Sequence, residues 1–526
     1  MKKFILLLST LLVTLQVEAT GPQRQVILNA DGTYTVLDHP GYGCCSDVGI
    51  GTPRLIDSKA FSGSGADGLT PYGTTASGVV KTIGSPTIPI IMVGFPDLPF
   101  MEETTKEKVS RMFNEAGYHD YDYISSSGTK TIKCHGSVRD YFLSQSHGLF
   151  QPNFVVVDSI TANMGYAYYG KPSATQNDSH VSELVTEACQ KAYDHGADFS
   201  ETWASPHTTP LVIIYHAGQG QHAAYDEHWE DYIWAHFKQE SRATTDEQQI
   251  FSSYYIGNEA LGVYVKGGDG NPVLNNLCLA GPGVLIHELG HAIGLPDFYD
   301  TKDNSKTGTP NYWSVMDYGQ YYQNGYNPVG YSCYERALVG WQDYKCLGNE
   351  AEACELSASE CYILKDPGNE TKFYVLENRQ ADNVWYPNSL GSGLLVHKVN
   401  FDRSAWNNNR VNYNDTRRMV VIPADGESQN HRTYGGDWTK FQNDLFPGNA
   451  KGYTSFTPDF STETDDYGCY NITLENGVIS FNYRDKSTGI RSVEKASSQR
   501  VYDLQGRAAS TNGHGIYIIN GKKIIK

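Results

Sequence analysis

One run of residues constrains this chain more than any other feature. The sequence HELGHAIGLPD occupies residues 287–297, directly after a short apolar stretch. Positions four apart lie on one face of a helix, so His287 and His291 can direct both imidazoles at one metal ion. Glu288, beside the first histidine, is placed to take a proton from water and pass it to a leaving amine. The run therefore predicts a helix that carries half of a zinc site and a general base.

The residues after this helix supply a candidate third ligand. Gly294 stands where a left-handed residue could end the helix and turn the chain back beneath the metal. Asp297 would then arrive as the third ligand, because a carboxylate oxygen binds zinc well. Asp300, in the same loop, is the competing candidate. The spacing H-E-x-x-H-x-x-G-x-x-D resembles the metzincin signature, with Asp at the last ligand position.

A second motif follows in the order that a metzincin requires. Residues 313–318 read WSVMDY, which resembles the turn that lies under the metal in metzincins. Met316 is then the Met-turn residue. Tyr318 stands where some metzincins carry a tyrosine that stabilises the oxyanion, although packing is an alternative role for it. An HExxH pattern can arise by chance in a long helix, and the second motif argues against chance here.

The start of the chain indicates export. Residues 1–19 contain two lysines, an apolar run and small residues before the expected cleavage point, so we predict a signal peptide. No segment approaches the roughly 20 apolar residues that span a bilayer, so we expect no transmembrane segment. The net charge of -18 argues against nucleic acid as a partner, because a phosphate backbone would be repelled.

Residues 20–84 have the position of a propeptide. They lack long periodic segments, although residues 25–37 predict a short hairpin. A secreted protease must stay inactive during export, and Cys44 and Cys45 offer thiolates that could occupy the open zinc position. The alternative is that they are ordinary disulfide partners. Of the ten cysteines, we also expect those at 346, 354 and 361 to form at least one local bridge.

Residues 85–345 predict the catalytic domain. Strands alternate with helices before the HExxH run, which indicates an α/β layer. The expected strands are 87–95, 154–158 and 211–215, and the expected helices are 105–115, 137–142, 180–195 and 334–340. His216 and His236 invite a second metal site, but their spacing matches no ligand pattern, so polar packing or a cleft wall is the better interpretation.

Residues 346–485 predict a β-rich accessory domain, because apolar runs alternate with Gly, Asn and Asp turns. The expected strands are 373–377, 393–397, 419–422 and 478–481, and we predict a β-sandwich. Residues 486–526 predict a small terminal hairpin set. This segment resembles the sorting tails of Bacteroidetes secreted proteins, which implies outer-membrane secretion machinery as a partner. A plain hairpin that closes the preceding domain is the alternative.

Several motifs together resemble the immune inhibitor A family of secreted bacterial zinc metallopeptidases. They lie in the same order over residues 85–400 and read IPIIMVGFPD, SVRDYFLSQSHGLFQ, IIYHAGQGQ, IWAH, HELGHAIGLPDFYD, WSVMDYG, LENRQ and GSGLLVHKVN. The resemblance implies a zymogen with a metzincin-like catalytic domain, often stabilised by calcium. It implies His287 and His291 as zinc ligands and Glu288 as the base. The loop with Asp300, Asp303 and Asn304 gathers oxygen ligands as a calcium site would.

These patterns lead to one expectation and one rival. We expect an α/β, metzincin-like zinc peptidase domain followed by an all-β region, in a protein that is secreted to the extracellular space or the cell surface. Its substrates would be proteins or peptides. The rival is a secreted adhesin or glycan-binding protein on an inactive protease scaffold. Such a scaffold would be free to lose Glu288 or a histidine, and this chain retains all three.

Overall fold

A computed structural model gives the arrangement of most of the chain. The residues that it describes are 25–28, 34–37, 71–73, 78–119, 123–124, 130–172, 178–269, 271–302, 307–382, 384–429, 438–448, 452–460, 467–487, 501–502, 516–519 and 522–525. The expected signal peptide lies outside them, as do Cys44, Cys45, Asp303 and Asn304. Among the described residues, no helix combines the length and apolar character needed to cross a membrane.

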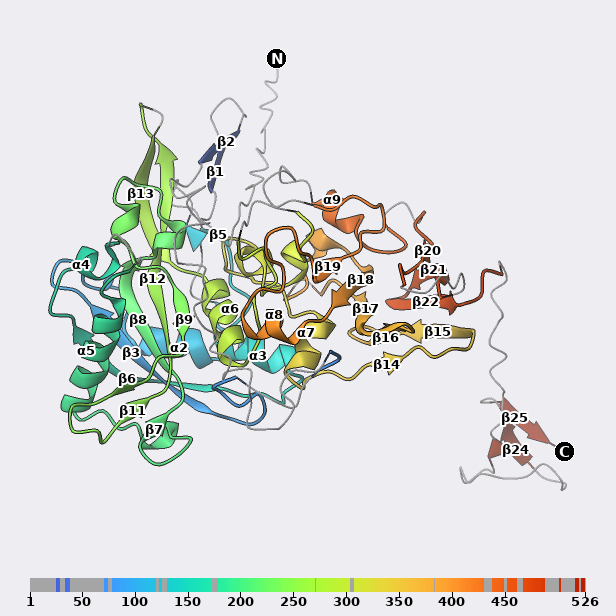
Figure 1. Cartoon of the computed structure of the whole chain (residues 1–526), viewed down its shortest axis with the longest axis horizontal. Coiled ribbons are helices and arrows are strands. Elements are labelled where there is room, and N and C mark those ends of the chain that lie inside the picture. The colour runs from blue at the N-terminus through green and yellow to red at the C-terminus, as the bar shows by residue number, and fades with distance from the viewer. Residues whose placement is uncertain are drawn as a thin grey trace, which may run out of the picture.

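A mixed sheet forms the centre of the first half (Figure 1). Its strands run in the order β13-β12-β8-β3-β6, with β9 also paired to β12. The pairs β12–β8, β8–β3 and β3–β6 are parallel. Strands β13 and β9 each pair antiparallel with β12. The bounds are β3 Thr87–Gly94, β6 Asn153–Thr161, β8 Val212–Gln219, β9 His236–Lys238, β12 Tyr254–Lys266 and β13 Pro272–Leu279.

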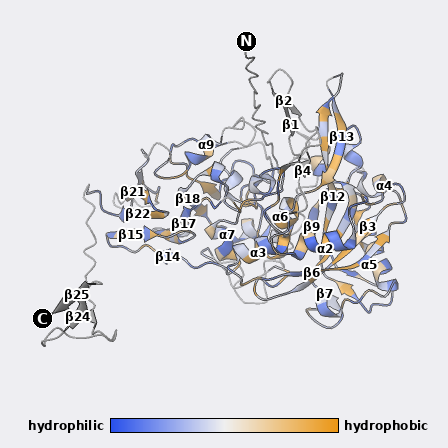
Figure 2. Ribbon diagram, turned by 180° about the vertical axis from the view of Figure 1, so that it is seen from behind, coloured by the Kyte–Doolittle hydropathy of each residue, from blue (hydrophilic) through white to orange (hydrophobic). Residues whose placement is uncertain are grey.

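Helices cover both faces of this sheet. In β3, Ile90 and Met92 point into one core with α2, α3 and α6, whereas Ile91 and Val93 point into another with α4 and α5. The strands are accordingly apolar on both faces, as the hydropathy colouring shows (Figure 2). The bounds are α2 Lys106–Asn114, α3 Val138–Gln145, α4 Tyr166–Gly170, α5 Val181–Asp194 and α6 Gly283–Ala292. The predicted α/β layer is therefore present.

Two further sheets form the second half. One has the order β14-β16-β17-β18-β19 and the other β15-β22-β21-β20. Leu376 and Val396 of the first share a buried core with Ile472 and Ile479 of the second. The bounds are β14 Lys345–Cys346, β15 Glu352–Leu356, β16 Cys361–Asp366, β17 Asn369–Arg379, β18 Gly393–Asn400, β19 Met419–Val421, β20 Ser455–Phe456, β21 Cys469–Glu475 and β22 Val478–Tyr483. All four predicted strands are present.

The first of these sheets also packs against the first half of the chain. Phe373 and Val375 of β17 belong to the same core as helix α6, which carries the HExxH run. Beside them, the buried Glu377 accepts from the Cys333 backbone N–H at 2.9 Å, and its other oxygen lies 3.1 Å from Arg379. Cys333 begins helix α7, Cys333–Leu338. The core of the β-rich region is therefore continuous with that of the first half.

The remaining elements are short. They are β1 Gln25–Leu28, β2 Tyr34–Leu37, β4 Tyr123–Ile124, β5 Lys130–Ile132, β7 Thr208–Thr209, β10 Arg242–Ala243, β11 Ile250–Phe251, α8 Arg403–Asn407, α9 Thr439–Gln442, β23 Val501–Tyr502, β24 Ile516–Ile519 and β25 Lys522–Ile525. Strands β1 and β2 form the predicted hairpin, and β24 pairs antiparallel with β25. Cys346, Cys354 and Cys361 are free thiols, so the expected local bridge is not seen.

Candidate active site

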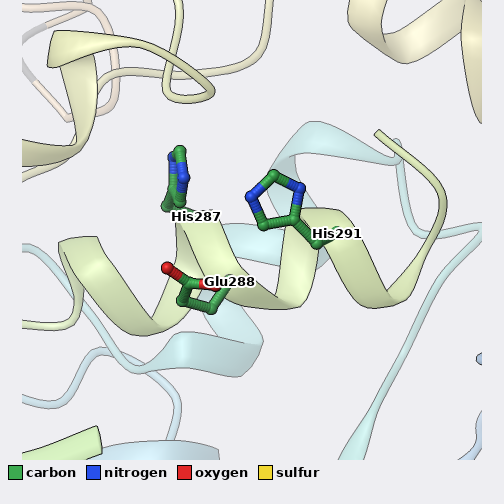
Figure 3. Close-up of side chains that lie close together, drawn as sticks. All are labelled: His287, Glu288 and His291. Carbon is green, nitrogen blue, oxygen red and sulfur yellow. The ribbon is translucent and has the colours of Figure 1, made fainter. Parts of the chain in front are cut away.

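Helix α6 presents both motif histidines on one face (Figure 3). Leu285, Ile286 and Leu289 bury the opposite face in the core, so the helix cannot rotate without exposing them. The rings of His287 and His291 lie 4.9 Å apart between centroids and nearly perpendicular to each other. Both side chains are buried, and Figure 3 shows the two imidazoles side by side above the helix. The i, i+4 spacing therefore gives the expected geometry.

Backbone carbonyls fix the orientation of both rings. His287 Nδ1 lies 2.9 Å from the Val315 carbonyl oxygen, and His291 Nδ1 lies 2.8 Å from that of Leu295. These contacts at Nδ1 leave Nε2 as the nitrogen of each ring that faces Asp297. Backbone partners of this kind are typical of metal-binding histidines. Both rings are thus oriented so that a metal would bind through Nε2.

Asp297 completes the cluster from the turn after the helix. Gly294 adopts φ +105°, the positive value expected where the chain reverses. Asp297 Oδ1 then lies 3.0 Å from His287 Nε2 and 3.3 Å from His291 Nε2. This oxygen is buried and receives no hydrogen bond from the described residues. Two imidazole nitrogens and a carboxylate oxygen therefore converge, which is stable only with a cation or a proton between them.

The spacing of these three atoms fits a metal ion. Zinc bonds of ~2.0–2.1 Å at tetrahedral angles place ligand atoms roughly 3.3 Å apart. The short distances between Asp297 and the two histidines also shift the pKa values of Asp297 and His291. Burial opposes ionisation of Asp297, but the two histidines outweigh it and hold its pKa far below the usual range. Burial likewise lowers the pKa of His291, yet attraction to Asp297 prevails and raises it to about 9. The cluster thus attracts positive charge, as a metal site must.

Glu288 lies beside this cluster and faces away from the core. One of its oxygens, one His287 nitrogen and one His291 nitrogen all lie within 4.8 Å of one another. Its Oε2 accepts from the Phe237 backbone N–H of β9 at 2.7 Å, which orients the carboxylate. Burial raises the pKa of Glu288, although the neighbouring histidines partly offset this effect. A raised pKa suits a group that takes and returns a proton near neutral pH.

Met316 lies directly beneath the helix. A Cβ atom added to Gly290 would meet the Met316 sulfur at 2.4 Å, so the thioether packs against the turn between the two histidines. Ser314 Oγ shapes the Met316 turn by donating to Glu335 at 2.5 Å and accepting from the Met316 N–H at 3.0 Å. The Phe298 N–H also donates to the Met316 carbonyl at 2.9 Å. The predicted turn therefore supports both the helix and the Asp297 loop.

Two tyrosines differ in their relation to the cluster. Tyr318 is buried in the core at 2% exposure, so a substrate would reach its hydroxyl only after a rearrangement. Tyr299, which the sequence analysis did not single out, has its ring 6.4 Å from that of His287. Burial, the charge of Asp297 and a hydrogen bond to it raise the pKa of Tyr299. Tyr299 therefore stays protonated and donates toward the Asp297 carboxylate.

Asp300 lies away from the histidines. Its Oδ2 forms an ion pair with Arg417 at 3.0 Å, and its Oδ1 accepts from the Lys302 and Asn414 N–H groups, both at 2.9 Å. Its charge is thus already compensated by an arginine. Within the described part of the chain, no cluster of metal ligands includes His216 or His236. His216 is buried and His236 is half-buried, and desolvation lowers the pKa of each to about 4.

A cavity lies beside the first turn of α6. It is small, with a volume of about 40 Å³, and its walls are mostly apolar. Leu285, two residues before the first histidine, forms part of its lining. The other principal lining residues come from α2, from the sheet and from the segment after the Met316 turn; they include Phe113, Tyr215, Tyr255, Leu261 and Tyr321. None of His287, Glu288, His291 and Asp297 lines this cavity.

Sequence reasoning missed several contributors for a physical reason. Tyr299 lies two residues beyond Asp297 and belongs to no spacing rule. Asn409 contacts Asp297 across 112 positions of sequence, and the sequence carries no signal for that contact. The β12–β13 hairpin could have been found, because residues 267–271 read GGDGN, which is a turn signal.

Comparisons with known proteins agree with this geometry. Residues 76–204 and 207–342, about half of the chain, match the family described as "Immune inhibitor A peptidase M6, catalytic domain". Pre-pro-metalloprotease PrtV of Vibrio cholerae is 27% identical over 303 residues, which are 50% of this chain and 31% of that protein. Immune inhibitor A of Bacillus thuringiensis is 28% identical over 250 residues, 43% of this chain and 33% of that protein. This chain thus spans about a third of these relatives, and it belongs to the immune inhibitor A peptidase M6 family.

Proposed function

We propose that this protein is a secreted zinc metalloendopeptidase that hydrolyses internal peptide bonds of proteins. The observation that carries the proposal is the convergence of three atoms, His287 Nε2, His291 Nε2 and Asp297 Oδ1, beside the carboxylate of Glu288. The family assignment and the name of the Vibrio relative support a metalloprotease. The helix, the turn at Gly294 and Met316 under the helix also support a metzincin-like fold.

The residues divide the work of hydrolysis. His287, His291 and Asp297 hold the ion. When bound, zinc supplies a Lewis acid that polarises the peptide carbonyl and acidifies water. Glu288 accepts the proton of the attacking water at its carboxylate and returns it to the leaving amine. Tyr318 remains our candidate for a second donor to the carbonyl oxygen, and it must first turn out of the core to serve.

The calcium loop, the sorting tail and the latency thiols Cys44 and Cys45 rest on sequence alone, and they remain part of the proposal.

The proposed export and latency follow from the order of the segments. A signal peptide at residues 1–19 precedes a proposed propeptide, and the printed name of the Vibrio relative includes "pre-pro". If latency depends on thiolates, Cys44→Ser with Cys45→Ser will release activity in the precursor. If the segment acts only by steric cover, the double variant stays latent until it is trimmed.

Product analysis with a general-base variant tests the function. Trimmed enzyme should cut a protein substrate at internal bonds, and chelation should stop it. Glu288→Gln should keep fold and zinc content while activity falls by roughly 10²–10⁴, the usual contribution of a general base. Exposed Glu107→Gln is the matched control and should keep full activity. A Glu288→Gln variant with wild-type activity would exclude the mechanism, and binding without cleavage by the wild type would favour the adhesin.

A further inference from the structure

The Asp297 loop is held by a residue from the β-rich region. Asn409 follows α8 and precedes β19, so it lies well beyond residue 342, where the family match ends. Its side-chain Nδ2 donates to Asp297 Oδ2 at 2.6 Å, and its Oδ1 accepts from the Asp297 backbone N–H, also at 2.6 Å. The side-chain amide of Asn409 therefore hydrogen-bonds to both the carboxylate and the backbone of the proposed third ligand, Asp297.

These two bonds determine which oxygen faces the histidines. With Oδ2 engaged by Asn409, Oδ1 is the atom left toward His287 and His291, and it receives no hydrogen bond. A primary amide suits this position because it donates and accepts at once. An aspartate would keep the acceptor but would set one carboxylate against another. A side chain without polar atoms would leave the buried Asp297 N–H unpaired.

Asn409 is itself firmly placed. It is 1% exposed and adopts φ +54°, a left-handed conformation that asparagine tolerates better than most residues. Its carbonyl accepts from Thr301 Oγ1 at 3.1 Å. Nearby Asn412 donates to the Phe298 carbonyl at 2.6 Å and accepts from the Thr301 N–H at 3.1 Å. Residues 409–412 therefore hydrogen-bond to the loop 297–301 at several points.

We propose that Asn409 is a positioning residue for the metal centre, and hence that the β-rich region completes the site. Asn409 acts through Asp297, fixing the carboxylate so that one oxygen is aimed at the metal position before metal arrives. The inference rests on the proposed function to the extent that Asp297 is a ligand. Loss of such an outer partner usually weakens metal affinity by 10–100-fold.

Zinc affinity of the full chain tests this proposal. We would measure it by competition with a chromophoric chelator for wild type, Asn409→Asp and Asn409→Gly, since both replacements tolerate the left-handed backbone. Asn408→Asp is the matched control, because it adds the same charge one residue away on an exposed side chain that donates to Ser404. We expect Asn409→Asp and Asn409→Gly to bind zinc at least 10-fold more weakly and Asn408→Asp to match wild type.

Two further readouts separate positioning from folding. The thermal midpoint of each metal-free protein shows whether the variant is folded, and Asn409→Gly is the milder change if Asn409→Asp fails. The visible spectrum of the Co²⁺-substituted protein reports coordination and should change in folded Asn409 variants alone. Wild-type affinity and an unchanged spectrum in those variants would overturn the proposal. Absence of zinc binding by the wild type would instead overturn the proposed function.

Discussion

At the scale of single residues, our proposal of Asp297 over Asp300 as the third ligand rests on the different surroundings of the two carboxylates. Both carboxylates stand in one loop, and the sequence allows either as the third ligand. The structure separates them, because Asp297 Oδ1 faces two imidazole nitrogens whereas Asp300 pairs with Arg417. A carboxylate that already has a guanidinium partner gains little from a metal. The two residues therefore predict different phenotypes.

Asp297→Ala should lower both zinc content and activity. A catalytic zinc site normally has three protein ligands, so a site with only two histidines retains zinc poorly. Asp300→Ala should keep its zinc and lose only loop stability. Metal analysis of both variants after dialysis against a weak chelator checks this prediction. Full zinc retention by Asp297→Ala, with loss in Asp300→Ala, would reassign the ligand.

Asp317, behind the Met316 turn, predicts a pH dependence of stability. Burial raises its pKa from 3.8 to about 7, despite hydrogen bonds from the Asn311 and Tyr318 N–H groups. The folded state then holds a proton that the unfolded state has lost, so stability falls as pH rises from about 4 to 7, by about 4 kcal/mol at most.

The Asp317→Asn variant checks this sign. Its neutral amide cannot ionise, so the metal-free variant should lose less thermal stability between pH 4.5 and 7.5 than the metal-free wild type. Exposed Asp343→Asn provides the matched control and should behave as wild type. An Asp317→Asn variant with the same pH dependence as wild type would show that the carboxyl is ionised in the folded state.

At the scale of elements, local patterns were predictable and distant contacts were not. The spacing of His287 and His291 fixes their helix face, and Gly294 marks the turn, because both depend on neighbours along the chain. The strands at 87–95 and 373–377 were equally visible as apolar runs. The contact of Asn409 with Asp297 joins chain segments that are far apart in sequence. The periodicity of neighbouring residues carries no signal for such a contact or for the packing of Tyr299.

Residues 78–84 illustrate this limit, because the sequence analysis places them in the propeptide. In the structure Val80 is buried and its N–H donates to the Ala292 carbonyl at 3.1 Å, at the end of α6. A Cβ atom on Gly78 would meet that same carbonyl at 2.2 Å, so this segment lies tightly against the helix. Trp341 Nε1 also donates to the Thr82 carbonyl at 2.6 Å. We therefore propose that the mature enzyme keeps this segment.

Processing should consequently occur before residue 78, where this segment begins. Mass spectrometry of the mature protein should find an N-terminus at or before that position. A chain that starts at residue 85 should have a lower thermal midpoint than one that starts at 78, because it loses the buried Val80 and the bond to Trp341. Equal midpoints and a natural N-terminus at 85 would restore the boundary predicted from sequence.

At the scale of the whole molecule, the catalytic half and the first β-sheet share one core. Phe298 of the ligand loop lies 6.4 Å from Trp406 of α8, and Tyr334 of α7 lies 5.9 Å from Phe373 of β17, between ring centroids. These aromatic contacts lie behind the metal cluster and join segments on both sides of residue 345. The domain boundary that we expected at residue 345 therefore does not interrupt the hydrophobic core, which contains residues from both sides of it.

A chain that ends at residue 345 should not fold stably. It would expose Phe298 and Tyr334 to water and lose Asn409. A chain that ends at residue 487, which lacks only the terminal segment, is the matched comparison and should keep its zinc and its thermal midpoint. Circular dichroism and metal analysis of both chains test the prediction. A soluble, cooperatively melting chain 1–345 with bound zinc would contradict it.

Zinc titration of the metal-free, trimmed enzyme tests the central claim most directly. The substrate is a peptide blocked at both ends, so only cleavage at an internal bond gives a signal. If His287, His291 and Asp297 form a single catalytic metal site, activity starts near zero, rises in proportion to added zinc and reaches a plateau at one equivalent. Full cleavage by the metal-free protein, or no cleavage at any zinc concentration, would contradict the account.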